Sequence, residues 1–382
     1  MRMTRILIVD DSVLYRKILQ EALNPLPGVE VAGTAANGSI ALKKMAQLHP
    51  DLLILDVEMP GMDGLQVLQQ VQETFPDTGV LMLSSHTTKG AQVTIDALDL
   101  GAFDFITKPD TGSMEGNIDS LRRELRFALH SFVRMQTIHR LVHSRSRNSS
   151  TQAPVSQLLT SHAAHSSSGS QSPSPSAQGL DVVGLGISTG GPVALTTILP
   201  TIPENIGVPF FVVQHMPPGF TRALAAKLNS LSALRVCEAE HGQNVQANTV
   251  YIAPGGKQMQ VVNHSPGVRA VVHVTDDPPE NNCKPSVDYL FRSLAQVYGP
   301  RAIGVIMTGM GTDGTQGLIQ LKEKGALVIA QDEATSTVYS MPKRPVEKGV
   351  VDVILPLDRI VGQITDWIMP GRVTASFSAE FK

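Results

Sequence analysis

Short hydrophobic runs alternate with helical patterns through roughly the first 110 residues of the chain. The runs read RILIVDD, VEVAGTA, DLLILDVEM, GVLMLSS and DFITKP, and amphipathic stretches such as SVLYRKILQEAL separate them. Strands that alternate with helices predict a parallel sheet with helices on both faces. We therefore expect a doubly wound α/β domain over residues 1–130. Its last helix should run from about Asn117 to His143, because Leu121, Leu125, Leu129 and Phe132 recur there at near-helical spacing.

A segment with few large hydrophobic residues follows this helix, from about Ser144 to Gly179. Ser, Gln, Ala, His and Pro dominate it, so it cannot bury enough apolar surface to offset the entropy lost on ordering. Residues 131–180 are therefore predicted to hold a helix extension that frays into a disordered linker. His162 and His165 lie there without a folded frame of further ligands, which disfavours a metal site.

The alternation of strands and helices resumes after the linker. The runs DVVGLGI, FFVVQHM, TVYIAP, AIGVIMTG, ALVIAQ and VVDVILPL predict a second doubly wound, Rossmann-like α/β domain over residues 181–375. The segment QMQVVNHSPGVRAVVHV instead predicts a local antiparallel β-hairpin around a Ser-Pro-Gly turn.

Length and composition narrow the possible functions. The 382 residues suit two ordinary domains, and the formal net charge of -3 gives no general attraction to nucleic acid. No compact basic helix-turn-helix follows the linker, so we expect no nucleic-acid partner.

The only two cysteines, Cys237 and Cys283, fit a reducing compartment and are expected to be inert thiols. The N-terminus leads straight into a strand, and no apolar run is long enough to span a bilayer. We therefore expect a cytoplasmic protein without membrane insertion.

Polar residues end the predicted strands of the first domain. Asp10 and Asp11 end the first strand, Asp56 the third, Ser84 the fourth and Lys108 the fifth. The carboxyl ends of parallel strands open on one edge of the sheet, so these side chains should share a crevice. Three converging carboxylates repel each other unless a hard cation such as Mg²⁺ neutralises them. Asp56 would then attack a phosphoryl donor, while Lys108 and the Ser84 hydroxyl contact its oxygens.

The motifs IVDDS, LDVEMPGMDG, SS and TKP at these positions resemble the receiver domains of two-component response regulators, over about residues 4–130. The resemblance implies a flavodoxin-like fold, phosphorylation of Asp56, and a histidine kinase as phosphodonor. It assigns the Mg²⁺ site to Asp10, Asp11, Asp56 and Glu58, the last through its backbone carbonyl. It assigns switch positions to Ser84, Phe105 and Lys108, and it suggests a cis peptide bond between Lys108 and Pro109.

Three strand ends of the second domain also carry polar residues. In VVGLGISTGGPVALTTIL, Ser188 lies in a Gly-rich turn before a helix that Pro192 opens, where free N–H groups can hold an oxyanion. His215 follows the strand in FFVVQHM, and Asp313 follows AIGVIMTG. Together they predict a triad in which Ser188 attacks, His215 takes its proton and Asp313 orients the imidazole.

Other interpretations of these segments exist. Each Gly-rich turn alone can simply cap a helix, and a turn of this kind can also bind a phosphate. However, GISTGGP lacks the ending of a P-loop and GLGIST lacks the full GxGxxG pattern. GISTG also fits the nucleophile turn of α/β-hydrolases, in which the acid precedes the base. That arrangement would need His241, His264 or His273 as base with Glu238 or Glu240 before it, and none of these histidines ends a parallel strand as clearly as His215.

The motifs GISTGGP, QHMP, VYIAPG and TGMGTDG resemble the catalytic domain of the bacterial chemotaxis protein-glutamate methylesterases. With the receiver motifs, the resemblance covers nearly the whole chain outside the linker. It implies hydrolysis of glutamate γ-methyl esters on methyl-accepting chemoreceptors, with release of methanol, and deamidation of receptor glutamines. It implies no cofactor in the esterase site. It assigns an oxyanion-binding backbone N–H to Met310 and support of His215 to Thr189.

A switchable domain tethered to an enzyme domain implies regulation. We expect the unphosphorylated receiver to lie across the strand ends that carry Ser188 and to block access for receptor helices. Phosphorylation of Asp56 would then repack the docking face. Allosteric couplings are typically ~1 to 3 kcal/mol, so the expected brake is partial.

Overall fold

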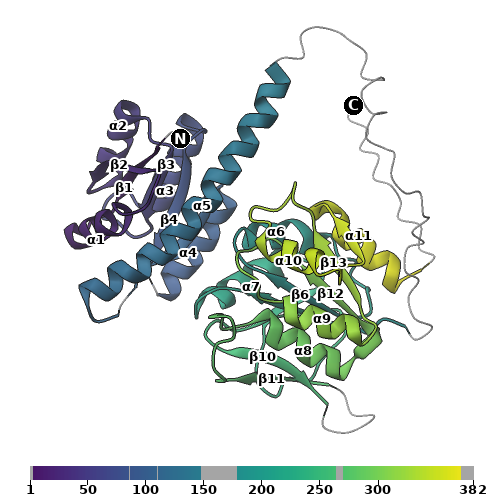
Figure 1. The fold of residues 1–382 in the computed structure, drawn as a ribbon. Helices are drawn as coiled ribbons and strands as arrows, with labels where there is room; N and C mark the ends of the chain where they lie inside the picture. Colours follow the sequence, from purple (N-terminus) through teal and green to yellow (C-terminus); the bar gives the residue numbers. More distant parts are fainter. Residues whose placement is uncertain (1–2, 86, 110, 148–178, 264–269, 371–382) are drawn as a thin grey trace.

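The computed structural model describes residues 3–85, 87–109, 111–147, 179–263 and 270–370, which form two α/β domains (Figure 1). Most of the predicted linker, including His162 and His165, lies outside the described residues, as does His264. No helix within the described ranges combines the length and apolar character needed to cross a membrane.

The first domain is built on a five-stranded parallel sheet in the order β2-β1-β3-β4-β5, which is the flavodoxin-like order. The strands are β1 (Thr4–Val9), β2 (Val29–Ala35), β3 (Leu52–Asp56), β4 (Gly79–Ser84) and β5 (Asp104–Thr107). The helices are α1 (Val13–Leu23), α2 (Gly38–Leu48), α3 (Gly64–Thr74), α4 (Thr88–Asp99) and α5 (Met114–Arg147). The direction of winding reverses between β1 and β3, so the crevice for a ligand lies at their carboxyl ends.

Local sequence explains where these elements begin. Ser12 caps α1 by accepting a hydrogen bond from the Tyr15 N–H, and Asp63 with Gln66 forms a capping box at the start of α3. The predicted apolar stripe of α5 is buried, and it packs on the same face of the sheet as α1. The helix continues to Arg147, four residues beyond its expected end.

The second domain has a seven-stranded sheet in the order β14-β13-β12-β6-β7-β9-β8, with every pair parallel. Its strands are β6 (Val182–Ile187), β7 (Phe210–Gln214), β8 (Arg235–Glu238), β9 (Thr249–Ile252), β12 (Ala302–Ile306), β13 (Leu327–Gln331) and β14 (Val353–Leu355). Its helices are α6 (Gly191–Ile198), α7 (Phe220–Leu231), α8 (Val287–Val297), α9 (Thr315–Glu323), α10 (Ser340–Glu347) and α11 (Leu357–Ile368), with short 3₁₀ turns at Leu199–Thr201 and Gly299–Arg301.

The predicted hairpin is confirmed. Strands β10 (Gln258–Val262) and β11 (Val271–Thr275) pair antiparallel, apart from the main sheet. The residues of its turn, 264–269, lie outside the described ranges. Both predicted sheets and the hairpin therefore follow from the hydrophobic pattern.

Two glycines in β6 bring helix α8 close to the sheet. A Cβ atom on Gly184 would lie 2.5 Å from Leu294 Cδ1, and one on Gly186 would lie 2.3 Å from Val287 Cγ1. Any larger residue would push the helix away from the strand. Because β6 is the central strand, this close packing sets the position of the amino end of α8 relative to the strand ends.

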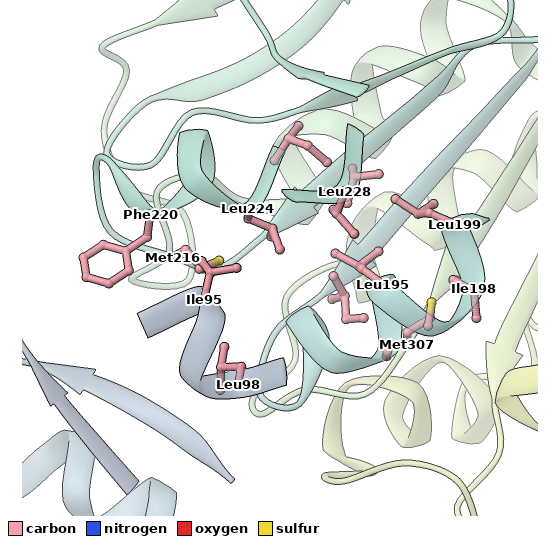
Figure 2. Packing of buried hydrophobic residues seen from close by; sticks show 14 of the residues in the cluster. Ile95, Leu98, Leu195, Ile198, Leu199, Met216, Phe220, Leu224, Leu228 and Met307 are labelled. Atoms are coloured by element: carbon pink, nitrogen blue, oxygen red, sulfur yellow. The ribbon is translucent and has the colours of Figure 1, made fainter. Parts of the chain in front are cut away.

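The two domains contact each other mainly through α4, which packs against α6 and α7. Ile95 and Leu98 of α4 belong to one buried cluster with Leu195 of α6 and Leu224 of α7 (Figure 2). An ion pair between Asp99 and Lys227 lies at the edge of this cluster. Hydrophobic contact rather than charge accounts for most of the packing, since partly exposed ion pairs contribute little.

Candidate active site and phosphorylation site

The carboxylates predicted to share a crevice in the first domain do so. Single oxygen atoms of Asp10, Asp11 and Asp56 lie within 4.8 Å of one another. Lys108 Nζ lies 2.8 Å from Oδ2 of Asp10 and 2.8 Å from Oδ2 of Asp56. Asp10 and Asp56 are buried, whereas Asp11 is exposed at the mouth of the crevice.

The cluster has the features of a divalent cation site. Oδ2 of Asp10 and Oδ2 of Asp56 are buried, and among the described residues a single cation, Lys108, lies against both of them at 2.8 Å. Burial raises the pKa of Asp56 to about 6, and the positive charge of Lys108 opposes this shift only in part. Oxygen ligands with uncompensated negative charge suit Mg²⁺. The residues present therefore fit the cation that the sequence predicts.

The predicted switch residues lie between this crevice and the second domain. The buried Ser84 hydroxyl lies 2.8 Å from Thr94 Oγ1 on α4, and no hydrogen bond joins it to Asp56 in the described chain. Phe105 on β5 stacks on Phe220 of the second domain, with ring centroids 4.9 Å apart. Ser84, through α4, and Phe105 thus lie between the crevice and the surface of the receiver that packs on the second domain. The Glu58 side chain accepts a hydrogen bond from Ser85 Oγ at 3.0 Å.

The expectation of a cis Lys108–Pro109 bond is wrong. Within the described residues, the only cis peptide bond joins Lys284 to Pro285. Trans is the intrinsically preferred form even before proline, and the Pro109 carbonyl accepts a hydrogen bond from the Tyr15 hydroxyl in this form.

Ser188 directly follows the central strand β6, in a turn that only glycine permits. Gly190 has a φ of 75°, and a Cβ atom on Gly191 would lie 1.9 Å from Gln214 Oε1. The Gly191 N–H donates to the Ser188 carbonyl at 2.8 Å, and Gln214 Nε2 donates to the same oxygen at 3.0 Å. Pro192 lies in the first turn of α6, as predicted. The serine is half-buried and held at the amino end of a helix.

His215 and Asp313 meet at the neighbouring strand ends. Nε2 of His215, just after β7, lies 2.8 Å from Oδ2 of Asp313, in the loop after β12. The winding of the sheet reverses between β6 and β12, so the three predicted residues surround its switch point.

The amino end of α8 holds the Asp313 carboxylate. The backbone N–H groups of Val287 and Asp288 donate to it at 2.7 and 3.2 Å, and the Ser286 hydroxyl donates at 2.8 Å. The positive end of a helix stabilises a carboxylate at this position. The Asp313 side chain is only 2% exposed to solvent, and each of its two carboxylate oxygens accepts a hydrogen bond from the protein.

His215 and Asp313 shift each other's pKa in opposite directions. Burial opposes ionisation of Asp313, but the hydrogen bond and charge of His215 and the N–H of Val287 outweigh it and lower the pKa of the carboxyl. Burial likewise opposes protonation of His215, but hydrogen bonds to Asp313 and Cys283 raise the pKa of the imidazole to about 9. The carboxylate thus favours the imidazolium, the form that a histidine base takes after it has accepted the proton of a nucleophile.

Ser188 and His215 line one cavity of about 180 Å³, which the receiver helps to enclose. Within the described residues, the Ser188 hydroxyl has no hydrogen bond to the imidazole, and His215 Nδ1 lies 3.9 Å from Cys283 Sγ. Nδ1 is the ring nitrogen left for Ser188, because Nε2 faces Asp313. Catalytic hydrogen bonds are often loose before substrate binds.

The two residues that were predicted to support the reaction, Met310 and Thr189, differ in the contacts that they make. No described group accepts a hydrogen bond from the Met310 backbone N–H, and the preceding Gly309 is so close that a Cβ atom there would lie 2.8 Å from Ser188 Cβ. Thr189 lines the same cavity, and its carbonyl accepts a hydrogen bond from Thr308 Oγ1. Among the described residues, no hydrogen bond joins the Thr189 side chain to His215.

The alternative bases of the α/β-hydrolase interpretation lie elsewhere. His241 contacts His273 of hairpin strand β11, with ring centroids 4.5 Å apart and the rings tilted, and neither histidine lines the Ser188 cavity. Glu238 accepts hydrogen bonds from Thr221 and Arg222 instead of approaching a histidine.

Three residues that no sequence pattern singled out also contact the pair. Asn281 Nδ2 donates to Asp313 at 3.1 Å, Ser286 binds the same carboxylate, and Cys283 faces His215. Ser286 was detectable as the residue that caps α8. Asn281 and Cys283 lie in a loop, where no periodicity indicates a direction.

The receiver closes the cavity from the opposite side. Asp104, Phe105, Ile106 and Thr107 of β5 and Glu124 of α5 line it together with Ser188, Thr189, Pro192, Gln214, His215 and Pro217. An α-helix with its side chains is about 10–12 Å wide. A space of this volume cannot admit one while the domains stay docked.

Comparisons with known proteins identify the families of the two domains. A family model described as "CheB methylesterase" matches residues 183–364, and one described as "Response regulator receiver domain" matches residues 6–117. A protein-glutamate methylesterase/protein-glutamine glutaminase of Desulfotalea psychrophila is 44% identical over 364 residues, which cover 95% of this chain and 98% of that protein. A Bacillus subtilis protein of the same name is 40% identical, covering 97% of this chain and 100% of the relative.

A crystal structure of the Thermotoga maritima CheB methylesterase catalytic domain is 40% identical and covers 50% of this chain and 99% of that domain, with a TM-score of 0.48. The two sequence relatives match this chain over nearly its whole length and theirs, and both family models match as well. The chain therefore belongs to the CheB methylesterase family, with a response regulator receiver domain ahead of its methylesterase domain.

Proposed function

We propose that the chain is a phosphorylation-activated protein-glutamate methylesterase that hydrolyses glutamate γ-methyl esters on chemoreceptors and deamidates receptor glutamines during chemotactic adaptation. The observation that carries this proposal is the Ser188 turn sharing one cavity with a His215–Asp313 pair. In this proposal residues 1–130 form the receiver, 131–180 the helix extension and linker, and 181–375 the catalytic domain. The partners are methyl-accepting chemoreceptors and a chemotaxis histidine kinase, all met in the cytoplasm.

In the proposed reaction, Ser188 Oγ attacks the ester carbonyl while Nδ1 of His215 takes the hydroxyl proton. The new C–O bond produces a tetrahedral oxyanion, and the Met310 N–H is available to stabilise it. Collapse breaks the bond to the methoxy oxygen, which leaves as methanol with the proton from His215. Water, activated by the same imidazole, then hydrolyses the Ser188 ester and restores the enzyme. A glutamine side chain follows the same path with ammonia as the leaving group.

On the receiver, Asp56 takes a phosphoryl group from the kinase. Asp10, Asp11 and Asp56, with the Glu58 carbonyl, would hold Mg²⁺, which offsets the charge of the phosphoryl oxygens when bound. Lys108, already close to Asp56, supplies a further positive charge. No cofactor is proposed for the esterase site.

The regulatory part of the proposal is that the docked receiver is the brake. It is supported by the cavity that both domains line and by the packing of α4 on α6 and α7. Phosphorylation would draw Ser84 toward Asp56 and away from Thr94 on that same helix. It would also draw Phe105 inward and away from Phe220. Both movements weaken the docked arrangement.

The function is tested by methanol release from methylated receptor membranes, measured with and without a small phosphodonor and Mg²⁺. The donor should raise the rate, by roughly 5- to 150-fold if the coupling is of ordinary size. Asp56→Asn should remove this stimulation and leave the unstimulated rate, because the acceptor oxygen is lost. Asp77→Asn, the same change at an exposed position of the receiver, should respond like the unaltered chain. Absence of methanol release under all these conditions would refute the proposed activity.

A second expected result concerns pH. Burial raises the pKa of Asp104 and of Glu124 to about 7, and both carboxyl groups line the shared cavity. The other titratable groups near them are His215, across the cavity, and Arg123 beside Glu124. Docking that buries these groups binds protons, so it is strongest below their ordinary pKa and weakens as pH rises through about 7.

The unphosphorylated enzyme should therefore open progressively as pH rises from the ordinary pKa values of these carboxyl groups, 3.8 and 4.5, to about 7, with no further change above that. The measurement is the ratio of its activity to that of the Asp104→Asn/Glu124→Gln double variant, because ionisation of His215 affects both and cancels. The ratio should rise with pH. A ratio that stays flat would show that these carboxyl groups do not contribute to docking.

A further inference from the structure

Cys283 lies against the ring nitrogen that the proposed mechanism uses. Its Sγ is 3.9 Å from His215 Nδ1, and both side chains are partly exposed. The thiol also contacts the Asn281 carbonyl at 3.5 Å. The proposed hydrolysis assigns no step to this sulfur atom.

The surroundings of the His215 ring leave Nδ1 as an open ligand. Single ligand atoms of His215, Cys283 and Asp313 lie within 4.8 Å of one another. The Asp313 oxygens already accept hydrogen bonds from His215, Asn281, Ser286 and the amino end of α8. Asp313 thus fixes the imidazole through Nε2 and leaves Nδ1 to face the sulfur. A histidine anchored by a carboxylate on one nitrogen and free on the other is the usual arrangement at zinc sites.

The distances suit a tetrahedral ion between sulfur and nitrogen. Zinc bonds of about 2.3 Å to sulfur and about 2.0–2.1 Å to nitrogen place the two ligand atoms about 3.5 Å apart at a tetrahedral angle. The observed 3.9 Å needs only a small approach of the cysteine side chain. A thiolate and an imidazole together prefer zinc to magnesium or calcium.

We propose that Cys283 and His215 form an inhibitory binding site for a thiophilic divalent cation of the Zn²⁺ type, oriented by Asp313. The ion occupies the Nδ1 lone pair, so the imidazole no longer accepts the Ser188 proton, and water or the Ser188 hydroxyl completes its coordination. Inhibition is reversible by a chelator. The inhibitory consequence rests on the proposed esterase function, whereas the binding site itself does not.

The binding test uses the chelator-treated full-length chain with Asp11→Asn and Asp56→Asn, which removes the other three-donor group of the described residues. Co²⁺ is the spectroscopic probe, because a thiolate-to-cobalt absorption band arises only when a cysteine is a ligand. The band should appear at one equivalent, disappear in Cys283→Ser and persist in Cys237→Ser. Cys237 is the matched control, since it is also half-buried but contacts Gln243 rather than a histidine.

The activity test measures Zn²⁺ inhibition of methanol release by the full-length chain, with each variant referred to its own metal-free rate. Removing a metal ligand should raise the half-inhibitory zinc concentration roughly tenfold or more in Cys283→Ser. Cys237→Ser should be inhibited like the unaltered chain. A cobalt band or zinc inhibition that is unchanged by Cys283→Ser overturns the proposal. A cobalt band that depends on Cys283 in a chain without esterase activity would instead retain the site and refute the proposed function.

Discussion

Ser188→Ala in the full-length chain should lower methanol release by about four orders of magnitude or more, because the variant lacks the hydroxyl that attacks the ester. His215→Ala should have an effect of similar size, since nucleophile and base act as one unit. The assay is methanol production from methylated receptor membranes by the phosphodonor-treated enzyme. Thermal unfolding of each variant should remain cooperative, because Ser188 is half-buried and its hydroxyl holds no described structural hydrogen bond.

Replacing Asp313 should be less damaging than replacing Ser188. Asp313→Ala leaves the imidazole in place but removes the group that orients it, and the oxyanion donor remains. Ser230→Ala, an exposed serine on α7, serves as the matched control and should keep full activity. Near-normal methanol release by purified Ser188→Ala would exclude this serine as the nucleophile.

Leu98→Asp should raise the unstimulated rate of methanol release several-fold and reduce the further stimulation by phosphodonor. Leu98 is 5% exposed and packs into the cluster that joins α4 to the esterase domain (Figure 2). A buried carboxylate at this point costs more than the docked arrangement gains from one apolar contact, roughly 1.5–3 kcal/mol. The expected limit is the rate of the fully phosphorylated enzyme.

Leu100→Asp provides the control for this variant, because Leu100 lies two residues away, is 37% exposed and is not part of the cluster. Its unstimulated rate should not change. An exchange of the ion pair adds an independent check: Asp99→Lys and Lys227→Asp should each open the enzyme slightly, and the double variant should close it again. If Leu98→Asp and Leu100→Asp behave alike, the packing of α4 is not the brake.

The geometry of a parallel sheet was enough to predict which residues would lie together at its carboxyl edge. Asp10 and Asp56, or Ser188 and His215, come together because each follows a buried strand whose carboxyl end opens on the same edge. The hydrophobic runs that predict the strands therefore also predict the sites. The hairpin followed from the same pattern.

The contacts made by loops and between domains could not be predicted in this way. Asn281 and Cys283 contact Asp313 and His215 from the loop before α8, where no hydrophobic periodicity indicates which way a side chain points. The stack of Phe105 on Phe220 depends on the fit between two separately folded surfaces, which no pattern within one domain encodes. The geometry of Lys108–Pro109 depends on a small energy difference, and the resemblance implied the wrong form.

The position of the Asp313 carboxylate at the amino end of α8 has a consequence for the evolution of the chain. This carboxylate accepts backbone N–H groups of another segment of the chain, so it caps a helix as well as orienting a base. Losing such a cap costs about 0.5–2 kcal/mol, a large share of the stability of an ordinary domain. In a descendant that had lost its esterase activity, Ser188 and His215 would be free to drift, while selection for folding would still retain the acid. Asp313 would then be the last of the three residues to be retained.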